Sequence, residues 1–202
     1  MKRVKGETLE VAWPNMSTAD RERVADQTAK ALLQLRTFES PRIQNVEGKP
    51  VFDSMLFLGG GLETPHGPLS SDDELWKEME TGISHVPEKA RRNLRLRMPR
   101  ASPYVLTHGD LTDINIIVNE GNLAGILDWE RAAYFPVWWE FAAARIGNSE
   151  ADAEWKALLR EHMPAHTEGQ QFWLDYYALR AYPDFRNEQG EKLFPELMGG
   201  DD

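Results

Sequence analysis

The decisive stretch of this chain reads HGDLTDIN, residues 108–115, and the sequence GILDWE follows it at residues 125–130. Its polar side chains are of the kinds that orient a hydroxyl group or hold a hard cation. A carboxylate such as that of Asp110 can accept a proton, and the side-chain oxygens of Asn115 and Asp128 are ligands that Mg²⁺ prefers. The pattern therefore indicates a metal-assisted reaction site, if the fold brings these three residues together.

Two short apolar runs between the motifs predict a β-hairpin. Residues 116–118 and 123–127 flank a run of turn-forming residues at 119–122. The midpoint between positions 115 and 128 falls inside that turn. We therefore expect Asn115 and Asp128 to lie nearly opposite each other at the open end of the hairpin, where both oxygen ligands face one ion.

Transfer of a phosphoryl group is the chemistry that this arrangement suits. It needs a carboxylate to orient the attacking hydroxyl, and oxygen ligands for the Mg²⁺ that neutralises charge on the phosphates. The spacing of five from Asp110 to Asn115 matches the kinase catalytic loop, in which an Asp base precedes an Asn metal ligand. Residues 104–107 read as the strand that leads into this loop.

Three strings, HGDLTDINIIV, GILDWE and AAYFPVWWEFA, resemble the aminoglycoside phosphotransferase and choline kinase-like family, whose fold is similar to that of protein kinases. The resemblance implies ATP- and Mg²⁺-dependent O-phosphorylation of a small molecule. It implies that Asp110 is the catalytic base, and that Asn115 and Asp128 hold the Mg²⁺ of the ATP cofactor. It also implies that His108 belongs to the catalytic site as a brace for the loop rather than as a proton carrier.

The N-terminal lobe of a kinase-like enzyme is not evident upstream of His108. Such a lobe carries a Gly-rich loop over the phosphates and a strand Lys that grips them. Residues 59–61 are all glycine, but they do not fit G-x-G-x-x-G because residue 64 is Thr. The earliest lysines, Lys2 and Lys5, lie outside any strand pattern of the V-A-I-K kind.

Residues 1–12 instead resemble the hinge-like segment through which family members pass into the C-terminal lobe. We therefore expect a single domain over residues 1–202, of the α+β class and mostly helical, equivalent to a kinase-like C-lobe with the N-lobe absent. Residues 104–130 would carry its catalytic loop, hairpin and metal motif.

The expected absence of an N-lobe leaves several functions open, because half of the nucleotide pocket would be missing. The chain is a shortened form of a kinase, or a C-lobe protein that has lost phosphotransfer, or an enzyme that uses the same cleft for another reaction. A non-kinase, pseudokinase-like module that binds a small ligand is therefore the alternative to a phosphotransferase.

Aromatic residues gather just after the second motif, at Trp129, Tyr134, Trp138 and Trp139. With Glu140 they could form a wall that holds a cationic amine by cation–π contacts and ion pairing. Core packing is the alternative use of such side chains.

Several other residues have competing interpretations. Exposed Asp and Asn are common in turns without any ligand role. Glu130 either supports the metal site or has a plain surface or helix-start role. The five histidines do not suggest a metal site, because Pro164 breaks the helix that would place His162 and His166 on one face, and we expect no zinc.

The overall charge bears on the partners. A net charge of −10 disfavours nucleic acid and anionic membranes and would suit a cationic small-molecule substrate, although acidic surfaces often serve solubility alone. The basic run at residues 89–100 reads as a solvated helix face, or as a contact for phosphate or a partner. Cysteine is absent, and no signal-peptide core or long apolar run is evident, so a cytoplasmic protein is expected. The oligomeric state is not predicted.

Helical periodicity and N-cap residues predict the remaining elements. Besides one small sheet, we expect a long loop at residues 39–70 with a short hairpin near 51–58. The expected helices span residues 17–38, 71–80, 87–97, 137–146 with Pro136 in its first turn, 149–163 and 168–181.

Overall fold

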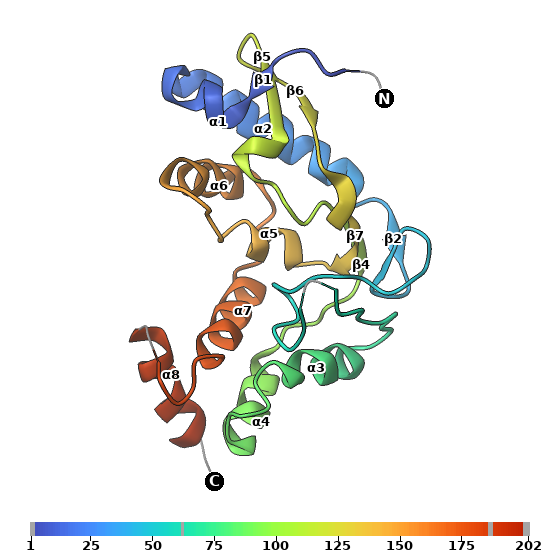
Figure 1. The fold of residues 1–202 in the computed structure, drawn as a ribbon, viewed down its shortest axis with the longest axis vertical. Helices are drawn as coiled ribbons and strands as arrows, with labels where there is room; N and C mark the ends of the chain where they lie inside the picture. Colours follow the sequence, from blue (N-terminus) through green and yellow to red (C-terminus); the bar gives the residue numbers. More distant parts are fainter. Residues whose placement is uncertain (1–2, 62, 186–187, 200–202) are drawn as a thin grey trace.

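The computed structural model describes residues 3–61, 63–185 and 188–199, so Met1 and Lys2 of the hinge-like segment lie outside the described residues. The chain forms an elongated α+β structure with the N-terminus near one end and the C-terminus near the other (Figure 1). The helices are α1 (Leu9–Ala12), α2 (Thr18–Leu35), α3 (Asp72–Thr81), α4 (Glu88–Arg97), α5 (Trp139–Ala143), α6 (Glu150–His162), α7 (Thr167–Leu179) and α8 (Glu188–Gly199). Short 3-10 helices are η1 (Trp13–Asn15), η2 (Asp113–Asn115) and η3 (Trp129–Arg131). The strands are β1 (Glu7–Thr8), β2 (Glu39–Ser40), β3 (Gln44–Asn45), β4 (Tyr104–Thr107), β5 (Ile116–Asn119), β6 (Asn122–Ile126) and β7 (Ala133–Pro136).

The predicted hairpin is confirmed. Strands β5 and β6 pair antiparallel, with Asn119 opposite Asn122. The two residues between them, Glu120 and Gly121, have φ of 52° and 71°, as a tight two-residue turn requires. Strand β1 pairs with β5 and completes a three-stranded sheet in the order β1-β5-β6.

A second sheet shows that the expectation of one small sheet is wrong. Its order is β2-β4-β7-β3, and all of its pairs are antiparallel. Pro136 ends β7 opposite Tyr104 instead of starting a helix, and the helix expected at 137–146 is only the short α5. Proline is tolerated there because it needs no ladder hydrogen bond at a strand end.

Three predicted helix starts are confirmed by their caps. The hydroxyl oxygens of Ser17, Ser71 and Ser149 accept hydrogen bonds from the backbone N–H three residues later, at 3.1, 3.2 and 3.1 Å. These contacts fix the first turns of α2, α3 and α6. Helices α4 and α7 also form where they are expected.

Other local expectations are wrong. The stretch 51–58 forms no hairpin; instead, single bridges join Val51 to His66 and Ile43 to Leu69. Phe38 lies beyond the end of α2 and is 58% exposed, so it does not pack on the core. Helix α8 is not anticipated by the sequence pattern.

Two hydrophobic clusters form the core. One packs α2, α6 and the three-stranded sheet around Trp155 and Ile116. The other packs α3, α4, α5 and α7 beneath the second sheet, around Trp139 and Phe172. Figure 1 shows α5 in the middle of the molecule, with α2 and α6 on one side and α3, α4 and α7 on the other. No described helix has the length and apolarity that crossing a membrane requires.

Candidate functional site

The loop between β4 and η2 places the predicted site residues at the centre of the molecule. Strand β4 ends at Thr107, and the chain then turns sharply at Gly109, whose φ of +82° lies in the region that glycine adopts without strain. Asp110 follows and is partly exposed. No hydrogen bond or ion pair involving its carboxylate is found within the described ranges, so this side chain is available to a ligand.

His108 joins the two motifs. It is fully buried, its Nδ1 lies 3.2 Å from the backbone N–H of Asp110, and its Nε2 lies 2.8 Å from the carbonyl oxygen of Leu127. Because Nδ1 must accept the first hydrogen bond, Nε2 carries the proton and donates the second. These two contacts fix the position of the ring and suit a side chain that braces the loop.

Glu140 supports the same loop from α5. Its carboxylate accepts the backbone N–H of His108 at 2.6 Å and that of Gly109 at 3.0 Å. The side chain is only 4% exposed, and this burial raises the pKa of the carboxyl, an effect that nearby His108 and the two N–H donors oppose. Both oxygens are engaged, so the structure gives Glu140 a contact with the loop that the sequence did not predict.

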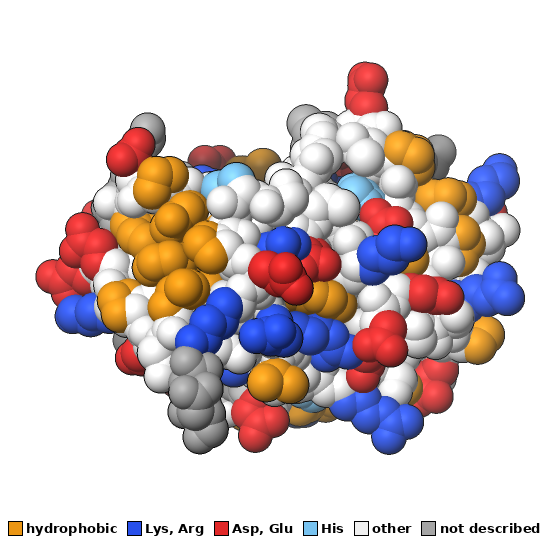
Figure 2. Space-filling model, turned by 90° about the horizontal axis from the view of Figure 1, so that it is seen from below, with side chains coloured by type: hydrophobic (Ala, Val, Ile, Leu, Met, Phe, Trp, Pro, Cys, Tyr) orange, Lys and Arg blue, Asp and Glu red, His pale blue; other side chains and the backbone are white. Residues whose placement is uncertain are grey.

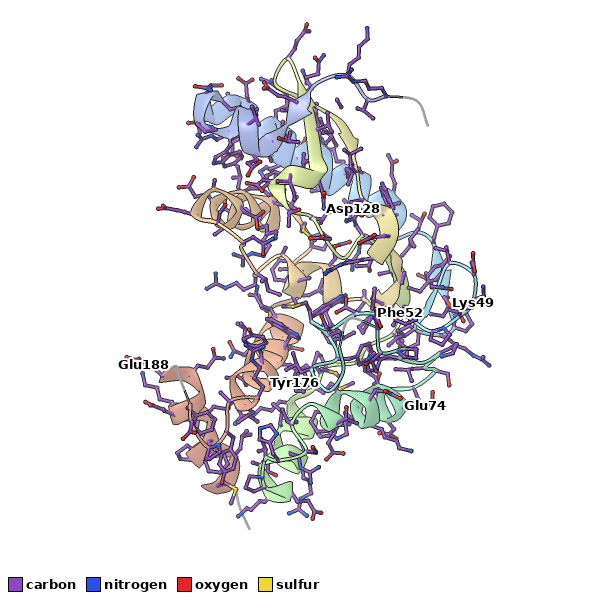
Figure 3. All side chains as sticks on the ribbon, viewed as in Figure 1. Lys49, Phe52, Glu74, Asp128, Tyr176 and Glu188 are labelled. Carbon is purple, nitrogen blue, oxygen red and sulfur yellow. The ribbon has the colours of Figure 1, made fainter. Side chains whose placement is uncertain are left out.

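Asn115 and Asp128 flank the two strands of the hairpin, just outside its open end. Ile116 pairs with Ile126, and the N–H of Leu127 donates to the carbonyl oxygen of Asn115 at 2.8 Å, which brings Asp128 beside Asn115. Figure 3 shows Asp128 where β6 ends, in the central region of the molecule.

The donor chemistry of this pair fits Mg²⁺. The Asn115 amide nitrogen donates to the carbonyl oxygen of Asp110 at 2.9 Å, which leaves its amide oxygen for another partner. Asp128 is exposed, and no bond to its carboxylate is found in the part of the chain that the structure describes. In the same residues no cluster of three or more acidic, His or Cys side chains suits a metal. Two oxygen ligands agree with Mg²⁺, which keeps several waters and phosphate oxygens around it.

Helix α6 also holds the loop, a feature that sequence reasoning missed. Trp155 donates its indole N–H to the carbonyl oxygen of Leu111 at 3.0 Å, and the Asp152 carboxylate accepts the backbone N–H of Asp113 at 3.0 Å. Lys156 pairs with Asp152 at 2.8 Å, with both side chains buried. The loop is thus hydrogen-bonded from α5 on one side and α6 on the other.

The predicted aromatic wall is not assembled as one surface. Trp138 and Trp139 are each 1% exposed and pack edge-to-face against each other, so their burial favours the core-packing alternative. Trp129 is 42% exposed and stacks edge-to-face on His108 at 4.7 Å. Glu130 is exposed, and no described residue binds it. The interpretation that Glu130 supports the metal site therefore stays a prediction.

The basic run at residues 89–100 behaves as a solvated helix face. Arg91 pairs with Glu80 at 2.6 Å, and Arg95 pairs with Asp73 at 2.9 Å. Figure 2 shows Lys and Arg side chains interspersed with acidic ones on the face that is seen from below Figure 1. The run therefore forms no uniformly positive surface.

A cavity of about 200 Å³ opens beside Asp110, between the loop that follows β4 and the segment that joins α5 to α6. Gly109, Glu140 and Lys156 also line it. A larger cavity of about 420 Å³ lies at the turn end of the hairpin, lined by Gly121 among others. We take the smaller cavity as the candidate site because the predicted base lines it.

Comparisons with known proteins bear on the family and the fold. A model of the phosphotransferase enzyme family matches residues 1–177. The gentamicin complex of APH(2'')-IIa resembles the whole chain with 16% identity and a TM-score of 0.53 over 70% of that protein. Aminoglycoside phosphotransferase APH(2'')-Ib, bound to ADP, matches 98% of the chain with 14% identity and a TM-score of 0.52 over 69% of its length. These likenesses show the fold. No curated protein sequence matches significantly.

Proposed function

The chain belongs to the phosphotransferase enzyme family, and from that membership we propose that it takes part in the ATP- and Mg²⁺-dependent phosphorylation of a hydroxyl group on a small molecule. The observation that supports the proposal is the hydrogen bond from the N–H of Leu127, the residue before Asp128, to the carbonyl oxygen of Asn115. The Asn115 amide in turn donates to the carbonyl oxygen of Asp110 on the loop.

Each of these residues has a role that its contacts support. The Asp110 carboxylate, free of other bonds among the described residues, accepts the hydrogen bond of the substrate hydroxyl and later its proton. The Asn115 amide oxygen and the Asp128 carboxylate would hold the Mg²⁺, which neutralises charge on the phosphates. His108 and Glu140 keep the loop in shape through their hydrogen bonds.

We further propose that the chain corresponds to the C-terminal lobe of the family fold, with the hairpin as the part that carries the site. Residues 7–8 form β1 against β5, which suits a segment that enters this lobe beside the hairpin. A small-ligand-binding module without phosphotransfer remains the rival proposal, and only the chemistry separates the two.

Phosphotransfer itself tests the proposal. The chain is incubated with Mg²⁺ and γ-labelled ATP and a panel of hydroxylated small molecules, and labelled product is separated and counted. We expect transfer to at least one acceptor, reduced by a factor of 10² or more in Asp110→Asn, which preserves shape but removes the base. Transfer that is unchanged in Asp110→Asn would refute the role of this residue, and no transfer by wild type would favour the binding module.

A further inference from the structure

The cavity beside Asp110 is lined by four charged groups of both signs, and two of them are already engaged within the protein. Six residues that line it are Met55, Gly109, Asp110, Arg131, Glu140 and Lys156. Glu140 is occupied by two backbone N–H groups of the loop. Lys156 is occupied by Asp152 and by the carbonyl oxygen of Ile146 at 2.7 Å. Neither of these two side chains has its charge available for a ligand.

Arg131 is the exception among the cations. It lies at the end of η3, directly after the second motif, and it is partly buried. Within the described residues it makes no hydrogen bond and no ion pair. Burial raises the pKa of the Asp53 carboxyl, and the positive charge of nearby Arg131 partly opposes that rise. Asp53 nevertheless makes no hydrogen bond to Arg131, and its Oδ1 accepts the N–H groups of Met55 and Leu56, both at 2.8 Å. The guanidinium therefore has five N–H donors without a fixed acceptor.

Two uncommitted groups of opposite charge thus line one small pocket. Asp110 can accept a hydrogen bond from a hydroxyl, and Arg131 can donate two parallel hydrogen bonds to a carboxylate or a phosphate. They do not pair with each other, since no ion pair between them lies within 4.0 Å in the described residues. A molecule that satisfies both groups carries a hydroxyl and an anionic group a short distance apart.

We infer that this pocket binds an acceptor that bears a carboxylate or phosphate near the hydroxyl to be phosphorylated, and that Arg131 selects it. The inference rests on the proposed function, because it names the substrate class of the same site. It also replaces the cationic substrate that the net charge of the chain suggested, since the local charge and not the total charge decides what the pocket holds.

Binding of simple anions to the full chain, without nucleotide or metal, tests whether Arg131 selects an anionic group. The probes are inorganic phosphate and, separately, acetate, titrated at constant ionic strength with chloride as background while backbone and arginine side-chain NMR signals are followed. We expect saturable shifts at Gly109, at Leu111 and at the Arg131 side chain. Arg131→Gln should weaken the binding about tenfold, because it removes a charge-assisted pair of hydrogen bonds.

Two control variants keep the result interpretable. Arg92→Gln removes an exposed arginine of α4, remote from the pocket, and should change nothing. Arg131→Lys keeps the charge and should restore part of the binding, which separates a lost contact from misfolding. Shifts that do not saturate, or that saturate in Arg131→Gln with the same affinity as in wild type, would overturn the inference. A stronger response to phosphate or to acetate tells which anion the acceptor carries.

Competition with Mg–ATP separates this inference from the proposed function. If Mg–ATP binds and displaces phosphate from Arg131, the guanidinium serves the nucleotide and the acceptor inference is overturned. If both bind together, it is supported. If Mg–ATP does not bind but phosphate still requires Arg131, the proposed function fails while the anionic pocket stands.

Discussion

The carboxylate of Glu140 lies 2.6 Å from the backbone nitrogen of His108, so a side chain on α5 fixes the loop that carries Asp110. Glu140 stands between Trp139, in one hydrophobic cluster, and Phe141, in the other. Its position is therefore set by both halves of the core. The relationship makes the geometry of the loop depend on the packing of the whole chain.

Removing this carboxylate should destabilise the fold. Glu140→Ala leaves the N–H groups of His108 and Gly109 buried without an acceptor, which costs about 2–4 kcal/mol in the free energy of unfolding. Glu140→Gln keeps one acceptor oxygen and should lose roughly half as much. Urea denaturation followed by tryptophan fluorescence measures both. A loss below about 0.5 kcal/mol in Glu140→Ala would show that the loop is held by other contacts.

Asp113 should make stability depend on pH. Burial first, and the carboxylates of Asp152 and Glu10 second, raise the pKa of Asp113 above its ordinary value of 3.8. The folded state then binds the proton more tightly than the unfolded chain, so stability decreases as pH rises from about 3.8 through the folded-state pKa. Asp113→Asn removes this decrease.

The expected result is that Asp113→Asn is more stable than wild type at pH 7, by about 1 kcal/mol, because it removes a negative charge that burial and the carboxylates of Asp152 and Glu10 disfavour. At pH 3 the two proteins should be alike. Denaturation across this pH range measures the difference. A variant that is less stable than wild type at pH 7 would contradict the repulsion between Asp113 and Asp152.

The ion pair of Lys156 with Asp152 should be strongly coupled. Lys156→Met leaves the Asp152 carboxylate buried without its cation, which costs about 3–5 kcal/mol. The double variant with Asp152→Asn should recover part of that loss, because the uncompensated charge is gone. A double-mutant cycle by chemical denaturation measures the coupling.

Lys30→Met is the matched control for this cycle. Its partner Asp26 is exposed, and Lys30 itself is 68% exposed, so the change should be within about 0.5 kcal/mol. Equal effects at Lys156 and Lys30 would mean that burial of the first pair has no energetic consequence.

Gly109 should resist substitution because of its backbone angle. A Cβ there would meet Arg131 at ordinary contact distances of 3.5 Å and 3.7 Å, so crowding is not the obstacle. The obstacle is the φ of +82°, and Gly109→Ala should therefore lower the free energy of unfolding by about 1–2 kcal/mol. Gly61→Ala, where a Cβ meets nothing within 4 Å and φ is not in the left-handed region, should be nearly neutral. Thermal unfolding of both variants checks this. Equal melting temperatures would refute the strain argument.

The parts of the fold that the sequence predicts are those fixed by local interactions. The hairpin follows from its turn residues and the flanking strands, and the Ser caps follow from contacts three residues apart. The sequence predicts a helix start at Pro136, but proline suits both a first helical turn and a strand end, and only the pairing of β7 with β4 decides between them. Helix α8 contains Pro195 and two glycines, which hide its periodicity.

The same distinction applies to the site. Asp110, Asn115 and Asp128 belong to short motifs, so their proximity could be inferred from the hairpin. The hydrogen bond from the Asp113 N–H to the Asp152 carboxylate joins residues 39 positions apart, and no local sequence pattern predicts it. Two inward-facing residues on α6, Asp152 and Trp155, could have suggested a contact with the loop, but not which atoms they meet.

The central claim, that Asn115 and Asp128 hold the metal of a nucleotide, is tested most directly by calorimetric titration of the chain with ATP, with and without Mg²⁺. Asp128→Ala removes one ligand, and Asp73→Ala removes an exposed carboxylate on α3 as control. We predict binding that requires Mg²⁺, weakens at least about tenfold in Asp128→Ala and is unchanged in Asp73→Ala. Binding that is equally strong in Asp128→Ala, or no binding to the wild-type chain, would contradict the claim.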